Sequence, residues 1–112
     1  MLTIDALKAF GVNVDEGLAR CMNNEAFYLK LVKMAVEDGC FDRLAQAVDS
    51  QNKQEAFAAA HDLKGVLGNL SITPLYSLVS QITELLRAGE DVDYPSQVAA
   101  LMEQRNKLKA LC

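Results

Sequence analysis

The sequence predicts an all-α fold: an antiparallel up-and-down four-helix bundle with short N-terminal helices capping one end. Its apolar residues recur every three or four positions instead of alternating, which is typical of helices. The chain has 112 residues, of which 51% are hydrophobic. A chain of this length and composition can bury one core, so we expect a single domain over residues 1–112.

The first helices are expected to be short. Segment 3–10 has helical spacing and is followed by Gly11, a residue that commonly ends a helix. Segment 15–22 opens with two acidic residues, which favour the first turn of a helix. A core helix is predicted over 23–39, between an Asn cap and Gly39. Its apolar face comprises Phe27, Leu31, Met34 and Ala35, flanked by Tyr28 and Val32.

Four helices of about 11 to 19 residues, joined by short loops, indicate the bundle itself. Thr73 is a candidate N-cap, Pro74 suits the first helical position, and Gly89 is a candidate stop. The first of the four spans 40–50. The second is a long helix that follows the polar segment 51–54 and carries His61. The third spans 72–90, and the last opens at Pro95.

The charge and cysteine content exclude several classes of protein. Eleven basic against 15 acidic residues give a net charge of −4, which disfavours a nucleic-acid partner. Three cysteines without CxxC spacing suggest reduced thiols instead of a disulfide framework or a zinc site. The sequence has no apolar run long enough for a membrane span and no signal-peptide pattern at its start, so we expect a cytoplasmic protein that does not bind a membrane. We also expect it to be a monomer.

A helical wheel divides the long helix into two faces. The stripe expected to face the bundle interior is Ala56, Ala60, Leu63, Leu67 and Leu70. The opposite side carries His61, Lys64, Gly65 and Gly68, with Phe57 one turn before the histidine.

The two glycines are costly in a helix, because each destabilises an exposed helical position by about 1 kcal/mol relative to alanine. Their missing Cβ atoms would let another protein surface approach the helix closely beside His61. A partly exposed Phe57 would add an apolar contact; the alternative is that its ring is buried under the short N-terminal helix. We therefore expect this face to bind a partner.

A lone imidazole can act as an acid or base, bind a metal, or carry a covalent group. A metal site is disfavoured, because Lys64 and Gly65 occupy the positions where a second ligand would lie. A hydrolase is disfavoured because the chain has no nucleophile elbow. Covalent catalysis remains, with Lys64 placed one turn away to offset the charge of a phosphoryl group on the ring.

The segment "AAHDLKGVLGNL" (59–70) resembles the signature of histidine-containing phosphotransfer (HPt) domains: His, any residue, Leu, Lys, Gly, two more, then a small residue. The helices before and after also look like those of the family, so the resemblance covers nearly the whole chain. It implies that His61 is the phosphoacceptor, that Lys64 steadies the phosphoryl group, and that Gly65 and Gly68 clear space for a receiver domain. Asn69 is a candidate contact.

Many members of that family have a glutamine in the following helix, near the phosphohistidine. An ungapped alignment places Thr83 at that position, and Gln81 lies two residues before it.

The resemblance further implies a phosphorelay intermediate that passes a phosphoryl group between the aspartates of response-regulator receiver domains; a hybrid sensor histidine kinase is a further candidate partner. Magnesium would then belong to the receiver, and this chain would need no cofactor of its own. It has no P-loop or glycine-rich nucleotide loop, so we expect no autokinase activity. The alternative is a non-catalytic helical interaction module of the same shape, against which the presence of His61 counts.

Overall fold

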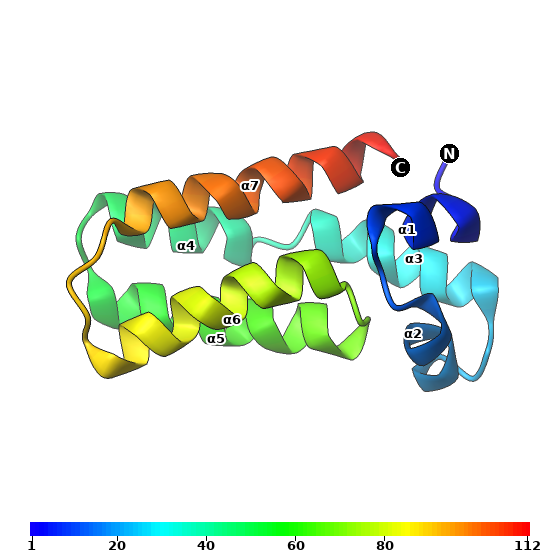
Figure 1. Cartoon of the computed structure of the whole chain (residues 1–112), viewed down its shortest axis with the longest axis horizontal. Helices are drawn as coiled ribbons and strands as arrows, with labels where there is room; N and C mark the ends of the chain where they lie inside the picture. The colour runs from blue at the N-terminus through cyan, green and yellow to red at the C-terminus, as the bar shows by residue number, and fades with distance from the viewer.

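The computed structural model describes residues 1–112 and consists of seven α-helices joined by short turns, with no strand. Figure 1 shows them arranged along a molecule with extents of 41 × 23 × 20 Å. The all-α prediction is confirmed. The helices are α1 (Ile4–Phe10), α2 (Val14–Arg20), α3 (Glu25–Val36), α4 (Cys40–Asp49), α5 (Lys53–Asn69), α6 (Thr73–Ala88) and α7 (Tyr94–Ala110).

Helices α4 to α7 form the bundle. Helix α5 packs against α4 on one side and α6 on the other, and α7 closes the ring by packing against α6 and α4 (Figure 1). Each of these four helices is joined to the next by a short turn and runs antiparallel to the one before it (Figure 1). The predicted up-and-down bundle is therefore confirmed, with α5 in contact with both neighbours along its length.

The N-terminal helices close one end of this bundle, as predicted. Helix α3 lies end to end with α4 and packs against α7 and α2 (Figure 1). Its buried Tyr28 donates a hydrogen bond of 2.7 Å to the carbonyl of Leu70, at the turn between α5 and α6. A Cβ on Gly17 of α2 would lie 2.5 Å from the Tyr28 ring, so the absence of a side chain there lets α2 pack directly on α3.

Side-chain caps begin five of the seven helices, and glycines end two of them. Thr3, Asn13, Asn24, Asn52 and Asp93 each accept a hydrogen bond from a backbone N–H in the first turn of the following helix. Gly11 and Gly89 end α1 and α6 in the left-handed conformation, with φ of 104° and 70°. Two of the three predicted glycine stops, Gly11 and Gly89, are therefore confirmed.

Two of the predicted cap residues were wrong. Thr73 is the first residue of α6 and not its cap: Ile72 holds the cap position, and the Thr73 hydroxyl donates to the carbonyl of Ser71. Gly39 does not end α3, which stops at Val36; it precedes α4 as its N-cap. In both cases the backbone turns through two or three residues, too few for composition to fix the boundary.

The predicted apolar face of α3 was also displaced. Its buried residues are Tyr28, Val32, Ala35 and Val36, whereas Phe27 is 45% and Met34 58% exposed. Helix α3 is apolar over most of its surface, but its main neighbours, α2 and α7, cover only one side of it. The placement of those neighbours decides which apolar residues are buried.

Candidate functional site

Helix α5 holds His61 on the outside of the bundle. The predicted inward stripe is buried: Ala56, Ala60, Leu63 and Leu67 along the helix and Leu70 just after it. Three alanines at positions 56, 59 and 60 keep that side of α5 thin where it meets α4 and α6. His61 points away from this stripe and is exposed, and none of the hydrogen bonds or ion pairs within the chain engages its ring.

An aromatic and cationic stack adjoins His61. The Phe57 and His61 ring centroids lie 5.8 Å apart with an interplanar angle of 33°. The Arg87 guanidinium, from α6, lies 5.2 Å from the Phe57 centroid. Phe57 is half-buried, which agrees with its predicted place beside the histidine and leaves part of the ring available for contact.

Lys64 lies one turn after His61, on the side of α5 that faces α6. Its Nζ is 3.6 Å from Oε1 of Glu84, and Nε of Arg87 is 3.2 Å from Oε2 of the same carboxylate. A single carboxylate on α6 thus pairs with the two cations on either side of His61.

The two glycines differ. A Cβ at Gly65 would meet nothing within 4 Å, so the backbone is open there, as the wheel predicts. At Gly68 a Cβ would lie 2.9 Å from the Tyr76 ring, and Arg20 donates a 2.6 Å hydrogen bond to the Gly68 carbonyl. The space expected beside both glycines is therefore open at Gly65 but not at Gly68, where Tyr76 of α6 and Arg20 of α2 already lie. Asn69 is exposed at the last turn of α5.

The two α6 residues named from the family alignment do not interact with Lys64. Thr83 is fully buried, and its hydroxyl donates a 2.7 Å hydrogen bond to the carbonyl of Val79. Gln81 is exposed but lies about 60° further round α6 from Glu84, away from the flank that carries Arg87. The residue of α6 that reaches Lys64 is Glu84.

Glu84 and Arg87 were missed by sequence reasoning, although a usable signal was present. Helices α5 and α6 are joined by a three-residue turn, 70–72, so reflecting one helix onto the other about residue 71 places residue 81 level with His61, with Glu84 and Arg87 one and two turns further along α6. The apolar period of α6 then puts Thr83 inside and Glu84 and Arg87 on the flank towards α5.

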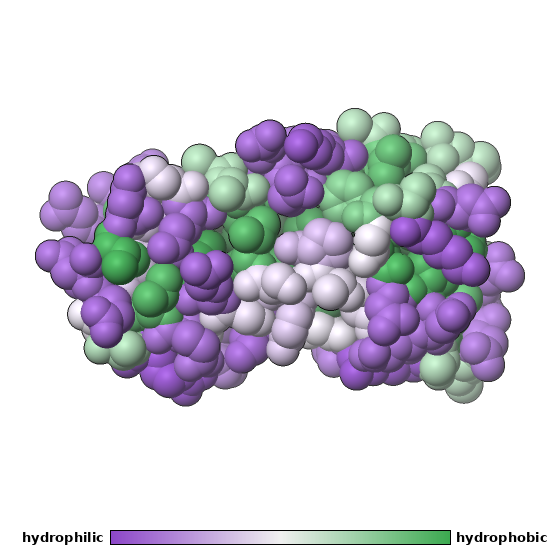
Figure 2. Space-filling view, in the orientation of Figure 1, coloured by the Kyte–Doolittle hydropathy of each residue, from purple (hydrophilic) through white to green (hydrophobic).

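An uncharged surface extends from this cluster. Residues 65–83 contain no Asp, Glu, Lys, Arg or His. Figure 2 shows the result as a pale band across the middle of the face, over the adjoining parts of α5 and α6, with hydrophilic regions on both sides. A band of this kind favours contact with a partner through small and uncharged groups.

The other flank of α5 is fixed to α4 by ion pairs. Arg43 donates to Glu55 and, at 2.9 Å, to Asp62. These hydrogen bonds raise the pKa of the Arg43 guanidinium. Nearby, burial and the Asp38 carboxylate raise the pKa of the half-buried Cys40 thiol, which makes it a poor nucleophile.

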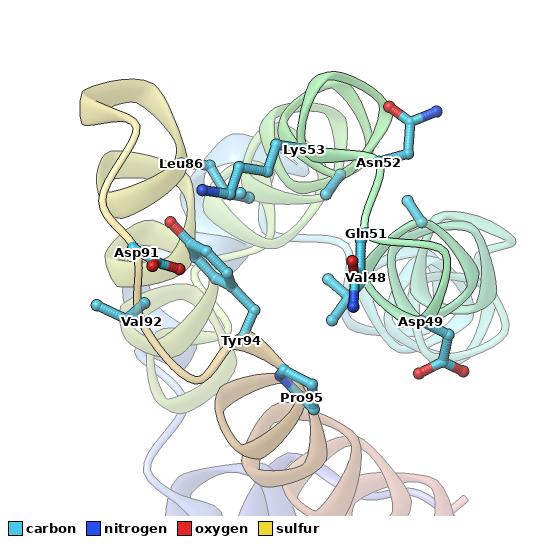
Figure 3. A pocket seen from close by; sticks show the side chains of 12 residues that line it. Val48, Asp49, Gln51, Asn52, Lys53, Leu86, Asp91, Val92, Tyr94 and Pro95 are labelled. Atoms are coloured by element: carbon cyan, nitrogen blue, oxygen red, sulfur yellow. The ribbon is translucent and has the colours of Figure 1, made fainter.

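A pocket of about 460 Å³ lies at the end of the bundle far from the N-terminal cap. In Figure 3, Lys53, Asp91 and Tyr94 project into it, while Asp49 and Asn52 point away. None of the residues predicted to form the site lines this pocket.

The chain has no group of three or more His, Cys, Asp or Glu side chains placed to hold a metal ion. None of the helices has the length and apolar character needed to cross a lipid bilayer.

Comparison with known proteins identifies the family. The family model described as "Hpt domain" matches residues 35–111, which is more than half of the chain. No curated protein and no solved structure matches this chain. The matched range is narrower than the resemblance that the sequence suggested, since it leaves α1, α2 and nearly all of α3 outside. It includes α4 to α7, the complete bundle, together with His61 and every residue of the cluster around it; the chain therefore belongs to the Hpt domain family, the phosphotransfer modules of two-component signalling.

Proposed function

We propose that this domain is a phosphorelay intermediate that carries a phosphoryl group on His61 and exchanges it with aspartates of receiver domains. The observation that supports this most directly is the exposed imidazole of His61, which makes no hydrogen bond or ion pair and lies next to Lys64 and the open backbone of Gly65. A nucleophile placed in this way can be reached by a large partner, and the lysine supplies charge for an anionic adduct.

The proposed transfer step uses this geometry. A ring nitrogen of neutral His61 attacks the phosphorus of an aspartyl phosphate, the N–P bond forms as the O–P bond breaks, and the aspartate leaves as a carboxylate. The imidazole keeps the proton on its other nitrogen. Onward transfer is the reverse step on another receiver. This domain contributes the nucleophile and a positioned cation, so its catalysis is chiefly proximity and charge stabilisation.

The partner would supply the remaining chemistry. We assign magnesium to the receiver domain, with its acidic residues, and assign no cofactor or nucleotide to this chain. The docking surface would comprise Phe57, Gly65, Asn69 and the uncharged band beside them, with Gly68 acting through its packing on Tyr76. The three cysteines are free, which suits a reducing compartment such as the cytoplasm.

Intact-mass measurement after incubation with phosphoramidate at neutral pH tests the proposal. We expect wild-type protein to gain one phosphoryl group that brief acid treatment removes, and His61→Gln to gain none. His61 is exposed, so the variant should keep the helical circular dichroism and thermal midpoint of the wild type.

The alternative, a non-catalytic interaction module, predicts a different result. A folded wild-type protein that takes up nothing from phosphoramidate, and nothing from phosphorylated receiver domains, would favour it. Uptake that persists in His61→Gln would place the phosphoryl group on another residue.

A further inference from the structure

One carboxylate, that of Glu84, holds both cations near His61. Each of its oxygens engages one partner: Oε1 is 3.6 Å from Nζ of Lys64, and Oε2 is 3.2 Å from Nε of Arg87. The carboxylate is thus shared between a lysine of α5 and an arginine of its own helix, one turn further on.

The contacts between α5 and α6 place this carboxylate opposite the histidine. Phe57 of α5 meets Arg87, and Lys64 of α5 meets Glu84. His61 lies between Phe57 and Lys64 along α5, so the α6 side chains that contact its neighbours on either side are those of Arg87 and Glu84. Arg87 is also held by the Phe57 ring, whereas Glu84 is the partner that keeps Lys64 on the α6 side.

A phosphoryl group on His61 would compete with Glu84 for Lys64. It carries between one and two negative charges at neutral pH and has three acceptor oxygens. The side chain of Glu84 is 57% exposed, and ion pairs exposed to this degree are weak and exchange readily. Lys64 can therefore leave the carboxylate for the phosphoryl group at little cost to the fold.

We propose that Glu84 is a positioning residue that acts through Lys64: it holds the ammonium beside His61 before transfer and competes for it afterwards. This inference rests on the proposed function. Competition raises the free energy of the phosphorylated state and shortens its lifetime, which suits an intermediate that must give the group up. Glu84 sets this lifetime without touching the reacting atoms.

The test compares Glu84→Gln with a matched control, Glu103→Gln. Glu103 is an exposed carboxylate in a lysine pair on α7, so the control removes the same charge from a similar pair away from α5. Each protein is loaded with phosphoramidate, the donor is removed, and loss of the phosphoryl group is followed by intact mass. We expect Glu84→Gln to lengthen the half-life of phosphorylated His61 by about twofold to fivefold, and Glu103→Gln to leave it unchanged.

A second pair of variants tests whether Glu84 acts through Lys64. In a Lys64→Gln background, the substitution Glu84→Gln should have almost no further effect on the half-life. An equal effect in both backgrounds would overturn the mechanism, as would an unchanged or shorter half-life in Glu84→Gln alone. If wild-type protein takes up no phosphoryl group at all, the proposed function fails first; normal uptake with equal half-lives contradicts only the role of Glu84.

Discussion

The chemistry available to His61 depends on residues one helical turn away and on the helix packed alongside. Phe57 and Lys64 come from its own helix, whereas Glu84 and Arg87 come from α6. The histidine therefore lies in a mixed environment, with an aromatic ring on one side and a paired ammonium on the other. The backbone at Gly65, one turn after the histidine, is open: a Cβ there would meet nothing within 4 Å.

The two glycines should respond differently to alanine. We expect Gly65→Ala to raise the free energy of unfolding by about 0.5–1 kcal/mol, because the new methyl group meets nothing and helix propensity improves. Gly68→Ala should be clearly less stable than Gly65→Ala, because its methyl group must displace the Tyr76 ring. Urea denaturation of the two variants measures the difference.

The same pair of variants separates docking from folding. If the open backbone at Gly65 receives a partner, Gly65→Ala should slow exchange with a receiver domain yet leave uptake from phosphoramidate unchanged. Equal stability of the two alanine variants would contradict the packing role of Gly68, and unchanged exchange with a receiver would contradict the docking role of Gly65.

At the scale of the elements, one buried tyrosine of α3 joins α2, α3 and the turn between α5 and α6. Tyr28 packs against the bare backbone of Gly17, and its hydroxyl donates to Leu70 at the α5–α6 turn. Three elements thus meet at a single side chain. The turn that follows the His61 helix is held in place by this contact and by the hydrogen bond from Arg20 to Gly68.

Tyr28 should make the domain sensitive to alkali. Burial, with a smaller contribution from Cys21, raises the pKa of Tyr28 from 10.0 to about 12. The folded state therefore favours the neutral phenol, so this stabilisation is complete below about pH 10 and is lost as the pH rises towards 12. The urea midpoint should fall between pH 9 and about 11.5.

Tyr28→Phe is the control for that loss. The variant should be less stable at neutral pH by about 1 kcal/mol, because the Leu70 carbonyl loses its donor. Its midpoint should then fall less than that of the wild type over the alkaline range. A smaller fall in the urea midpoint is expected to remain in Tyr28→Phe, because burial and the nearby Glu90 and Asp91 also raise the pKa of Tyr94. An identical fall in both proteins would show that Tyr28 is not the titrating group.

For the whole molecule, the packing predicts an uneven distribution of local stability. Helices α5 and α6 pack most extensively against each other; α5 also packs against α4, and α6 against α7. Helices α1 and α2, in contrast, have seven residues each and lie at one end of the molecule. We expect the central amides of α5 and α6 to exchange hydrogen slowest, and those of α1 and α2 to exchange at least tenfold faster. Exchange followed by mass spectrometry of peptides measures this. Uniform protection would mean that the cap and the bundle open together.

The sequence alone determined the number and type of the main elements, because helical period, caps and glycine stops are local properties. It also placed His61 and its inward stripe on opposite sides of α5, since the wheel needs only the rise and turn of a helix. The motif around His61 pointed to the Hpt family before any contact was known, and the family comparison confirms it.

Only the tertiary structure decided which neighbours complete the site. The packing of α6 on α5 brought Glu84 to Lys64, buried Thr83, and filled the space at Gly68 with Tyr76. The placement of α2 and α7 likewise decided which apolar residues of α3 are buried. The reason is physical: the period of one helix fixes which side chains share a face, but the neighbour and the rotation at which it packs depend on the core as a whole.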